Sequence, residues 1–232
     1  MEESMTTKVV KRNGETTELN LEKVHKMVEH ACKGLAGVSE SAVEMNSGLQ
    51  FYDGIETADI QEILIRSAND LITLDNPNYQ FVAARLLLFS LRKAIYNGHP
   101  DGHPPLLDHV KSCCKKGVYD KEILDKFTEE EWEKLNSYID HDRDYLFTYA
   151  GMRQVCDKYL VQDRSSGEIY ETPQFMYMMI AATLFQEYKE NRLDYVRRYY
   201  DAISKHRINI PTPIMAGVRT PLRQFASCVL VD

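Results

Sequence analysis

The sequence has 232 residues and a net charge of −7, with 44% hydrophobic and 27% charged residues. This length allows one large domain or two small ones, and the composition is that of an ordinary globular protein. The acidic balance argues against a nucleic-acid partner, because nucleic-acid-binding domains usually carry a basic excess. The sequence shows neither a signal segment nor an apolar run of the ~18 residues that span a bilayer, so no membrane partner is expected.

The five cysteines are odd in number, and no two of them have C-x-x-C spacing. This pattern disfavours both a disulfide framework and a zinc site. We therefore expect a cytoplasmic protein with no metal bound by this chain.

The first predicted element is a hairpin over residues 8–20. Asn13-Gly14 lies between two short β-prone runs, and both residues tolerate the positive φ of a tight turn. Asn20 predicts the start of a helix, because its side chain can accept from free backbone N–H groups. Apolar residues at helical spacing follow it.

Three further helices are predicted before residue 98. Ser39 and Thr57 are expected to cap the second and third of them. The fourth begins near Asn76-Pro77, since proline is tolerated at the first helical position. Its stretch FVAARLLLFSLRKAIY is apolar on most sides, so we expect it at the centre of a helical bundle.

The stretch HPDGHPP, residues 99–105, is the best linker in the sequence, and we expect a domain boundary between residues 98 and 99. A second hairpin is predicted around Ser165-Ser166-Gly167. In the tail, three prolines forbid a long helix and FASCVLV predicts a buried strand. Helical patterns occupy residues 105–116, 120–126, 129–139, 145–160, 173–188 and 191–205.

Four basic residues among the first hundred lie at positions where their side chains could bind an anion. Lys11 and Arg12 come just before the hairpin turn, Lys23 is on the first turn of the next helix, and Lys93 is on the fourth helix. Cations around a helix start are what a triphosphate requires. Taken alone, the same residues are better explained as ordinary solvated surface charges, because surface lysines and arginines usually have no other role.

The segment VVKRNGETTELNLEKV resembles the opening of the ATP-cone, a regulatory domain made of a small hairpin and a four-helix bundle. FYDGIETADIQ and NPNYQFVAARLLLFSLRKAIY resemble later parts of the same domain. The resemblance implies ATP or dATP as an allosteric effector, bound with Mg. In the implied nucleotide site, lysines contact the phosphates. The base and sugar are surrounded by Thr57 and by the run Thr17–Lys23. The implied binding residues are Lys11, Arg12, Thr17, Glu18, Leu19, Asn20, Leu21, Glu22, Lys23, Thr57 and Lys93.

Two positions depart from that family pattern. His30 and Gln61 stand where the family carries an aromatic residue and a histidine near the nucleotide. The resemblance still predicts nucleotide binding, but these two departures leave open whether dATP inhibits.

The tail IPTPIMAGVRTPLRQFASCVLVD resembles the segment that opens the ten-stranded α/β barrel of class I ribonucleotide reductase large subunits. EIYETPQFMYMMIAATLF and IDHDRDYLFTYAGMRQVCDKYLVQDR resemble the helical region before that barrel. The resemblance implies a mainly α chain with an ATP-cone at 1–98. Residues 99–232 would form the helical region and first barrel strand of an incomplete catalytic domain. Cys228 would be one of two redox thiols, and Thr212 and Ser227 would contact the substrate diphosphate. Without the resemblance, Cys228 is better explained as a buried strand cysteine that acts as a small hydrophobic residue.

The family reduces ribonucleoside diphosphates to deoxyribonucleoside diphosphates by radical chemistry with a redox dithiol. The implied partners are the C-terminal remainder of the large subunit, a small subunit holding the metal-radical cofactor, and thioredoxin or glutaredoxin as reductant. This chain alone is expected to be inactive, and it is either a truncation or one piece of a naturally divided subunit. Two other interpretations remain: a free-standing ATP/dATP-sensing regulator without reductase activity, and a helical interaction domain without a ligand.

Overall fold

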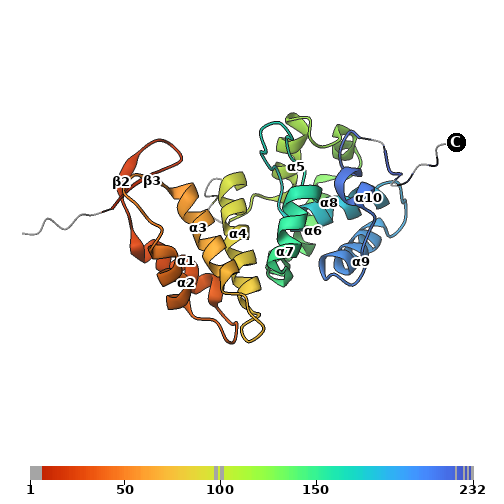
Figure 1. Cartoon of the computed structure of the whole chain (residues 1–232). Coiled ribbons are helices and arrows are strands. Elements are labelled where there is room, and N and C mark those ends of the chain that lie inside the picture. The colour runs from red at the N-terminus through yellow and green to blue at the C-terminus, as the bar shows by residue number, and fades with distance from the viewer. Residues whose placement is uncertain are drawn as a thin grey trace, which may run out of the picture. The chain divides into compact units, whose positions relative to one another are not determined.

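The computed structural model describes residues 7–96, 99, 102–222, 224–226, 228 and 230. The chain divides into two compact units, one made of Met1–Ser90 and Phe147–Arg153 and the other of Leu91–Leu146 and Gln154–Asp232. Helices dominate both units, as predicted, and a small sheet accompanies those of the first (Figure 1). The domain boundary between residues 98 and 99 stays a prediction.

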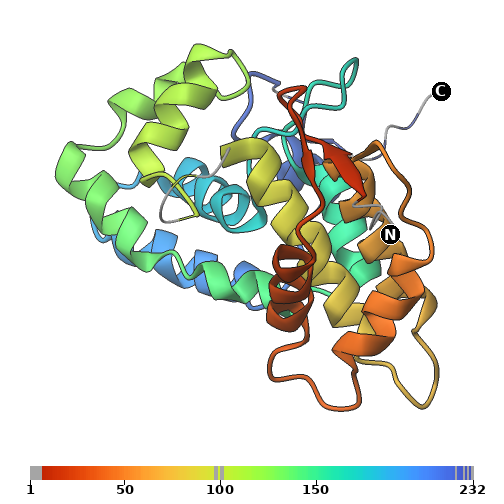
Figure 2. The ribbon, with the colours of Figure 1, turned by 90° about the vertical axis from the view of Figure 1, so that its left-hand side faces the viewer.

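The predicted N-terminal hairpin is confirmed. Strands β1 (Lys8–Val10) and β2 (Thr16–Glu18) pair antiparallel, and Gly14 in their turn has φ +82°. A third strand, β3 (Ile55–Glu56), pairs parallel with β1 and gives the strand order β2-β1-β3. This strand was not predicted, because two residues carry no alternating pattern. Figures 1 and 2 show the sheet at one end of the helices of its unit.

Two of the three predicted helix caps in this unit are confirmed. The side chain of Asn20 accepts from the backbone N–H of Lys23, and that of Ser39 accepts from Ala42. The prediction for Thr57 is wrong: Thr57 is already the first helical residue, and Glu56 before it makes no side-chain cap bond. The helices are α1 (Leu21–Cys32), α2 (Glu40–Gly48), α3 (Thr57–Asp70) and α4 (Tyr79–Tyr96).

Helix α4 is the central helix of the first bundle, as its apolar sequence predicted. Each fully buried leucine or isoleucine of such a core contributes roughly 2 kcal/mol. The guanidinium of Arg85 on α4 donates to the carbonyl oxygens of Ala31 and Lys33, at 3.0 and 2.8 Å, and so closes the C-terminal end of α1. The buried apolar residues of α1, α3 and α4 include Val24, Val28, Ala31, Ile60, Leu64, Ile65, Ala68, Val82, Leu86 and Leu88.

The second half of the chain is also helical. A capping box begins α6, because Thr128 and Glu131 exchange side-chain-to-backbone hydrogen bonds. The elements are α5 (Leu106–Lys115), the 3-10 turns η1 (Lys121–Asp125) and η2 (His141–Leu146), α6 (Glu129–Tyr138), α7 (Tyr149–Gln154), the π-helical turn η3 (Val155–Tyr159), α8 (Pro173–Phe185), α9 (Arg192–Ser204) and α10 (Thr212–Gly217).

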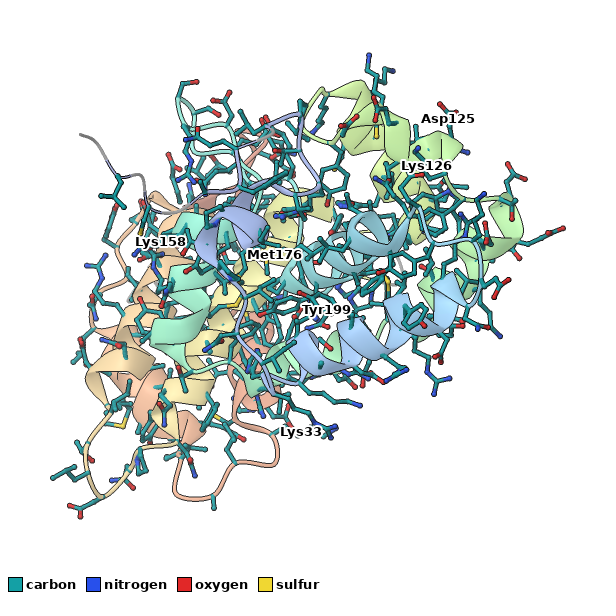
Figure 3. The ribbon with its side chains drawn as sticks, turned by 90° about the vertical axis from the view of Figure 1, so that its right-hand side faces the viewer. Lys33, Asp125, Lys126, Lys158, Met176 and Tyr199 are labelled. Carbon is teal, nitrogen blue, oxygen red and sulfur yellow. The ribbon has the colours of Figure 1, made fainter. Side chains whose placement is uncertain are left out.

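Helix α8 is the core of the second unit. All of its residues from Pro173 to Ala182 are buried, so it carries no polar face. Figure 3, which labels Met176 on α8 and Tyr199 on α9, shows these two helices running side by side. Asp144 is buried against α8, where it accepts from Gln174 at 2.9 Å and from Arg92 at 3.1 Å.

One long predicted helix is divided in the structure. The pattern over residues 145–160 is split into the end of η2, α7 and η3. The break has a local cause: the hydroxyl of Thr148 accepts from the backbone N–H of Gly151 at 3.2 Å, which starts a new helix. The hairpin around Ser165-Ser166-Gly167 is confirmed as a turn with a single bridge between Gln162 and Ile169.

The buried strand predicted for FASCVLV is wrong for the residues that the structure describes. Residues 224–226, 228 and 230 form no strand, and Phe225 and Leu230 are 41% and 97% exposed. A strand needs a hydrogen-bonded neighbour and an apolar cover, and this segment pairs with no strand of the described chain. Residues 224–226, 228 and 230 therefore contribute no barrel strand to the described part of the chain. Across the described residues, no helix is both long and apolar enough to cross a membrane.

Candidate functional site

The parallel pairing of β1 and β3 brings two basic residues to the start of a helix. Val10 pairs with Glu56, so Lys11 and Arg12, which follow β1, are neighbours of Thr57, the first residue of α3. Since no side chain caps α3, its first backbone N–H groups are available to an anion. Lys11 and Arg12 are both exposed. The arrangement suits a phosphate group.

Lys11 already has a carboxylate partner. Its Nζ lies 2.9 Å from an Oε atom of Glu15, and both side chains are about half exposed. Such an exposed pair contributes little to stability in water, so an incoming phosphate can replace it. The pair also holds the Lys11 side chain near the hairpin turn when no anion is bound.

The remaining predicted residues of this unit run along β2 into α1. Thr17 pairs with Val9, which pairs in turn with Ile55, so the three side chains share one face of the sheet. Val9 and Ile55 are buried, which makes this the face turned toward the helices, and Thr17 is half-buried on it. Glu18 ends β2 and half-buried Leu19 follows it.

The start of α1 is capped by its own sequence. The Asn20 side-chain oxygen accepts from the Lys23 backbone N–H at 2.9 Å. Leu21, Glu22 and Lys23 form the exposed first turn, with Glu22 at the end of the helix that favours negative charge. The structure therefore brings Lys11 next to Thr57, where β1 and β3 end, with Arg12 following in the hairpin turn, while the run from Thr17 to Lys23 passes from β2 into α1.

Lys93 is exposed on the last turn of α4, within the second unit. Its position relative to the sheet stays a prediction. The two residues that depart from the family pattern both contact α4. The rings of His30 and Phe89 meet edge to face at 5.4 Å, and the Gln61 amide donates to the backbone carbonyl of Leu86 at 3.0 Å.

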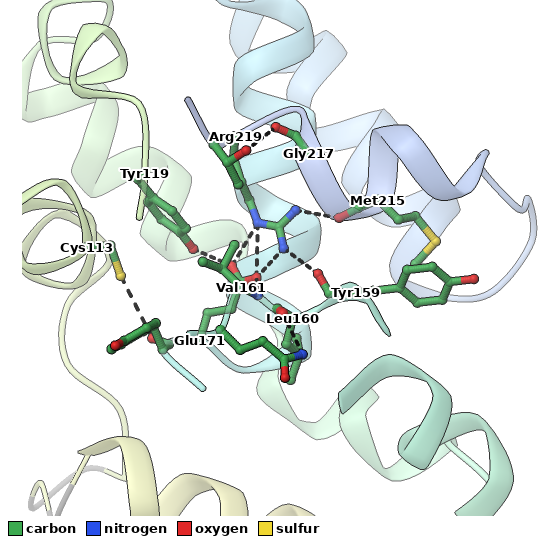
Figure 4. Close-up of polar contacts among 12 residues, drawn as sticks. Cys113, Tyr119, Tyr159, Leu160, Val161, Glu171, Met215, Gly217 and Arg219 are labelled. Carbon is green, nitrogen blue, oxygen red and sulfur yellow. Dashed lines mark hydrogen bonds and ion pairs between the residues drawn. The ribbon is translucent and has the colours of Figure 1, made fainter. Parts of the chain in front are cut away.

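The second unit contains a fully buried ion pair between Arg219 and Glu171 (Figure 4). The Arg219 Nε lies 2.9 and 3.1 Å from the two carboxylate oxygens, and a guanidinium Nη also donates to one of them. The carboxylate accepts two further bonds, from the Tyr119 hydroxyl at 2.5 Å and from the Val161 backbone N–H at 2.6 Å. The buried negative charge is thereby fully hydrogen-bonded.

The guanidinium of Arg219 also holds two backbone segments. It donates to the carbonyl oxygens of Met215 in α10 and of Tyr159 at the end of η3, at 2.5 and 2.8 Å. In the other direction, the carbonyl oxygen of Arg219 accepts from Asp120 N–H at 3.0 Å. The side chain of Arg219 therefore joins the tail of the described chain to Glu171 and Tyr159, and its backbone carbonyl joins the tail to Asp120.

The charges of this pair set the protonation of its neighbours. Burial alone would lower the pKa of Arg219, but the charge of Glu171 and the bonds to it outweigh burial and raise that pKa. Burial, and then the charge of Glu171, raises the pKa of Tyr119 well above its usual value. Burial, and then the positive charge of Arg219, lowers the pKa of His109 to about 3. Tyr119 is therefore held as a hydroxyl and His109 as a neutral imidazole.

A cysteine stands beside this network without being activated by it. The Cys113 sulfur lies 3.7 Å from Nε2 of His109, but burial raises the pKa of the thiol while the histidine stays neutral. A thiolate–imidazolium pair is thus disfavoured, and Cys113 is a packing residue. The described residues include no group of three His, Cys, Asp or Glu side chains that could hold a metal.

The predicted residues of the tail are placed as follows. Thr212 is the exposed first residue of α10, and its hydroxyl oxygen lies 3.4 Å from that of Tyr159. Cys228 is exposed, whereas the other four cysteines are buried. Ser227 lies outside the described residues.

Sequence reasoning missed the ion pair and the two tyrosines around it. Glu171 and Arg219 are 48 residues apart and lie in segments without a regular pattern. An arginine among the apolar and proline residues of the tail was the one available hint. Nothing in the local sequence identifies Tyr119 or Tyr159 as its neighbours.

Two family models match the chain. Residues 7–94 match the ATP cone domain, and residues 145–223 match the ribonucleotide reductase all-alpha domain. Among similar proteins are the ribonucleoside-diphosphate reductase subunit alpha of Haemophilus influenzae, 53% identical over 225 residues, and the ribonucleoside-diphosphate reductase 1 subunit alpha of Escherichia coli K12, 52% identical over 225 residues. The subunit alpha of Enterobacteria phage T4 is 42% identical over 226 residues.

These alignments cover 97% of this chain but only 29–30% of each relative. The chain therefore spans about three-tenths of the length of the curated relatives that it matches. The two matched domains follow one another in the order that the resemblance implied. The chain belongs to the class I ribonucleotide reductase alpha-subunit family and corresponds to its N-terminal three-tenths, with the ATP cone and the all-alpha domain.

Proposed function

We propose that this chain is the N-terminal part of a ribonucleoside-diphosphate reductase large subunit and that its first unit binds ATP or dATP as an allosteric effector. The observation that carries the effector site is the parallel pairing of Val10 with Glu56, which puts Lys11 and Arg12 beside the uncapped start of α3. Backbone N–H groups and two cations together are what the phosphates of a nucleotide require.

The other residues of the site are assigned by the family resemblance. In this proposal Lys11, Arg12 and Lys93 neutralise the triphosphate together with Mg. Thr57 and the run Thr17–Lys23 surround the base and sugar. The half-buried position of Thr17 on the helix-facing side of the sheet supports this part, because a base needs an apolar neighbour and a polar contact.

Isothermal titration of ATP and of dATP into this chain tests the effector site. Saturable heat at micromolar nucleotide is expected, and Lys11→Ala should weaken binding about tenfold or more, because charge-assisted bonds contribute roughly 1.5–3 kcal/mol. Lys116→Ala is the matched control, since Lys116 forms a similarly exposed pair with Glu168, 3.5 Å away, and both residues lie outside the proposed site. Absence of heat at high micromolar nucleotide, or equal losses in both variants, contradicts the proposal.

The second unit is proposed to supply part of the catalytic centre. Cys228 would be one of two thiols that reduce the substrate ribose, and Thr212 and Ser227 would contact the substrate diphosphate. Oxidation of two thiols to one disulfide releases two electrons and two protons, which is the balance needed when a ribose hydroxyl leaves as water. Thioredoxin or glutaredoxin would then reduce the disulfide, and a small subunit would supply the radical.

The reductase assignment is tested by complementation. This chain, joined to or co-expressed with the C-terminal remainder of a relative's subunit, should reduce CDP when the small subunit is added, while the chain alone should not. Cys228→Ser should abolish turnover, whereas Cys32→Ala should retain it, because Cys32 is buried in the first bundle. A free-standing sensor instead predicts nucleotide binding without any complementation.

A further inference from the structure

The exposed hydroxyl of Thr212 lies next to a second hydroxyl, that of Tyr159. The two oxygens are 3.4 Å apart, and the Gln154 side-chain amide donates to the Tyr159 oxygen at 3.2 Å. Because the tyrosine oxygen already accepts from Gln154, its own proton is available to the Thr212 oxygen. Either hydroxyl can be the donor in this pair, and when the tyrosine donates, the Thr212 proton points away from it, toward any anion at this surface.

The backbones that carry both hydroxyls are fixed by the same buried group. Arg219, locked by Glu171, donates to the carbonyl oxygen of Tyr159 itself and to that of Met215 in the helix that Thr212 begins (Figure 4). Tyr159 also ends a five-residue π-helical turn, a distortion that is uncommon and frequent at functional sites. The separation of the two hydroxyls is therefore set by a buried ion pair.

The two hydroxyls differ in their surroundings. Hydrogen bonds with Thr212 and then with Gln154 lower the pKa of Tyr159, because both groups can donate to its ionised oxygen. Tyr159 is half-buried and Thr212 is exposed, which leaves the threonine as the group that a ligand reaches.

We propose that Tyr159 is a positioning residue that orients the Thr212 hydroxyl for the diphosphate of the nucleotide substrate, and that the Glu171–Arg219 pair holds both in register. This inference rests on the proposed reductase function. Its ligand class is a nucleoside diphosphate, the substrate class of the proposed function, because the exposed Thr212 hydroxyl can donate to a phosphate oxygen.

Steady-state kinetics of the complete subunit, with this chain joined to its C-terminal remainder and assayed with the small subunit, test the inference. Tyr159→Phe should raise the KM for CDP about 3- to 10-fold and leave kcat within about twofold, as expected for one lost neutral hydrogen bond. Tyr195→Phe, which removes a partly exposed hydroxyl from α9, is the matched control and should change neither value.

A double variant separates positioning from independent contact or general loss of structure. If Tyr159 acts through Thr212, then Thr212→Val with Tyr159→Phe should have the same KM as Thr212→Val alone. An unchanged KM in Tyr159→Phe, or additive effects in the double variant, overturns the inference. If the unmodified complete subunit reduces no CDP, the proposed reductase function fails instead, so the two failures are distinguishable.

Discussion

Replacing Arg219 by methionine removes the positive half of the buried ion pair while keeping much of its volume. Glu171 would lose its charged partner but keep the Tyr119 hydroxyl and the Val161 N–H as donors. The carbonyl oxygens of Met215 and Tyr159 would lose their donor as well. Breaking a buried pair typically costs about 3–5 kcal/mol, and the two remaining donors place this variant near ~3 kcal/mol.

The opposite change should cost more. Glu171→Leu leaves the Arg219 guanidinium buried with two carbonyl acceptors, and it also strands the Tyr119 hydroxyl and the Val161 N–H. Each stranded donor adds about 1–3 kcal/mol to the cost of the unpaired charge, so we expect about 5 kcal/mol or more. The double variant removes both charges and should cost ~2–3 kcal/mol less than the sum of the single variants.

Urea unfolding followed by the fluorescence of Trp132 measures these values. Trp132 is the one tryptophan of the sequence, is 2% exposed and belongs to the second unit, so its signal reports the unit that contains the pair. A loss below about 1 kcal/mol in Arg219→Met, or strict additivity in the double variant, would refute the view that this pair fixes the tail of the described chain.

Three other predictions concern pH, thiols and the hairpin. Burial lowers the pKa of His109 to about 3 and of His141 to about 4, so the unfolded state binds more protons below pH ~6.5. Lowering the pH from 7 to 5 therefore reduces the free energy of unfolding by about 2 kcal/mol for each histidine. Asp144, whose pKa burial raises to about 6, takes up a proton in the folded state over the same range and restores roughly 1 kcal/mol. Urea midpoints that do not fall over this range would contradict the assignment. One thiol per chain should react rapidly with iodoacetamide at pH 8, and mass spectrometry should locate it at exposed Cys228; rapid labelling elsewhere argues against the packing described. Gly14→Ala should destabilise the first unit by ~1 kcal/mol in thermal unfolding because of its φ of +82°, and no change would mean that the turn relaxes.

Local patterns were sufficient where short-range chemistry decides the structure. The Asn13-Gly14 turn, the caps at Asn20 and Ser39 and the central apolar helix α4 are all confirmed, because each depends on neighbours within a few residues. The two matched domains extend well beyond these patterns, and their resemblance was carried by long stretches of sequence.

Interactions between distant segments were not predictable in the same way. The two-residue strand β3 exists because β1 provides a parallel edge for it, and Thr57 is the first helical residue because Glu56 is held in that strand. The FASCVLV segment has a strong strand pattern but no pairing neighbour in the described chain, and pattern alone does not form a strand. The sequence thus predicted which residues belong to the candidate effector site, whereas their relative positions follow from the strand pairing.

The Glu171–Arg219 pair also bears on the order in which the protein is made. Glu171, Tyr119 and Val161 all precede Arg219 in the chain, so a ribosome completes the acidic side of the pair long before its counterion. Until residue 219 has emerged, the nascent unit must keep that carboxylate hydrated or protonated, and its apolar surroundings cannot close around it. Final closure of the second unit therefore coincides with the arrival of the tail, and a product that stops short of Arg219 would remain an open target for chaperones and proteases.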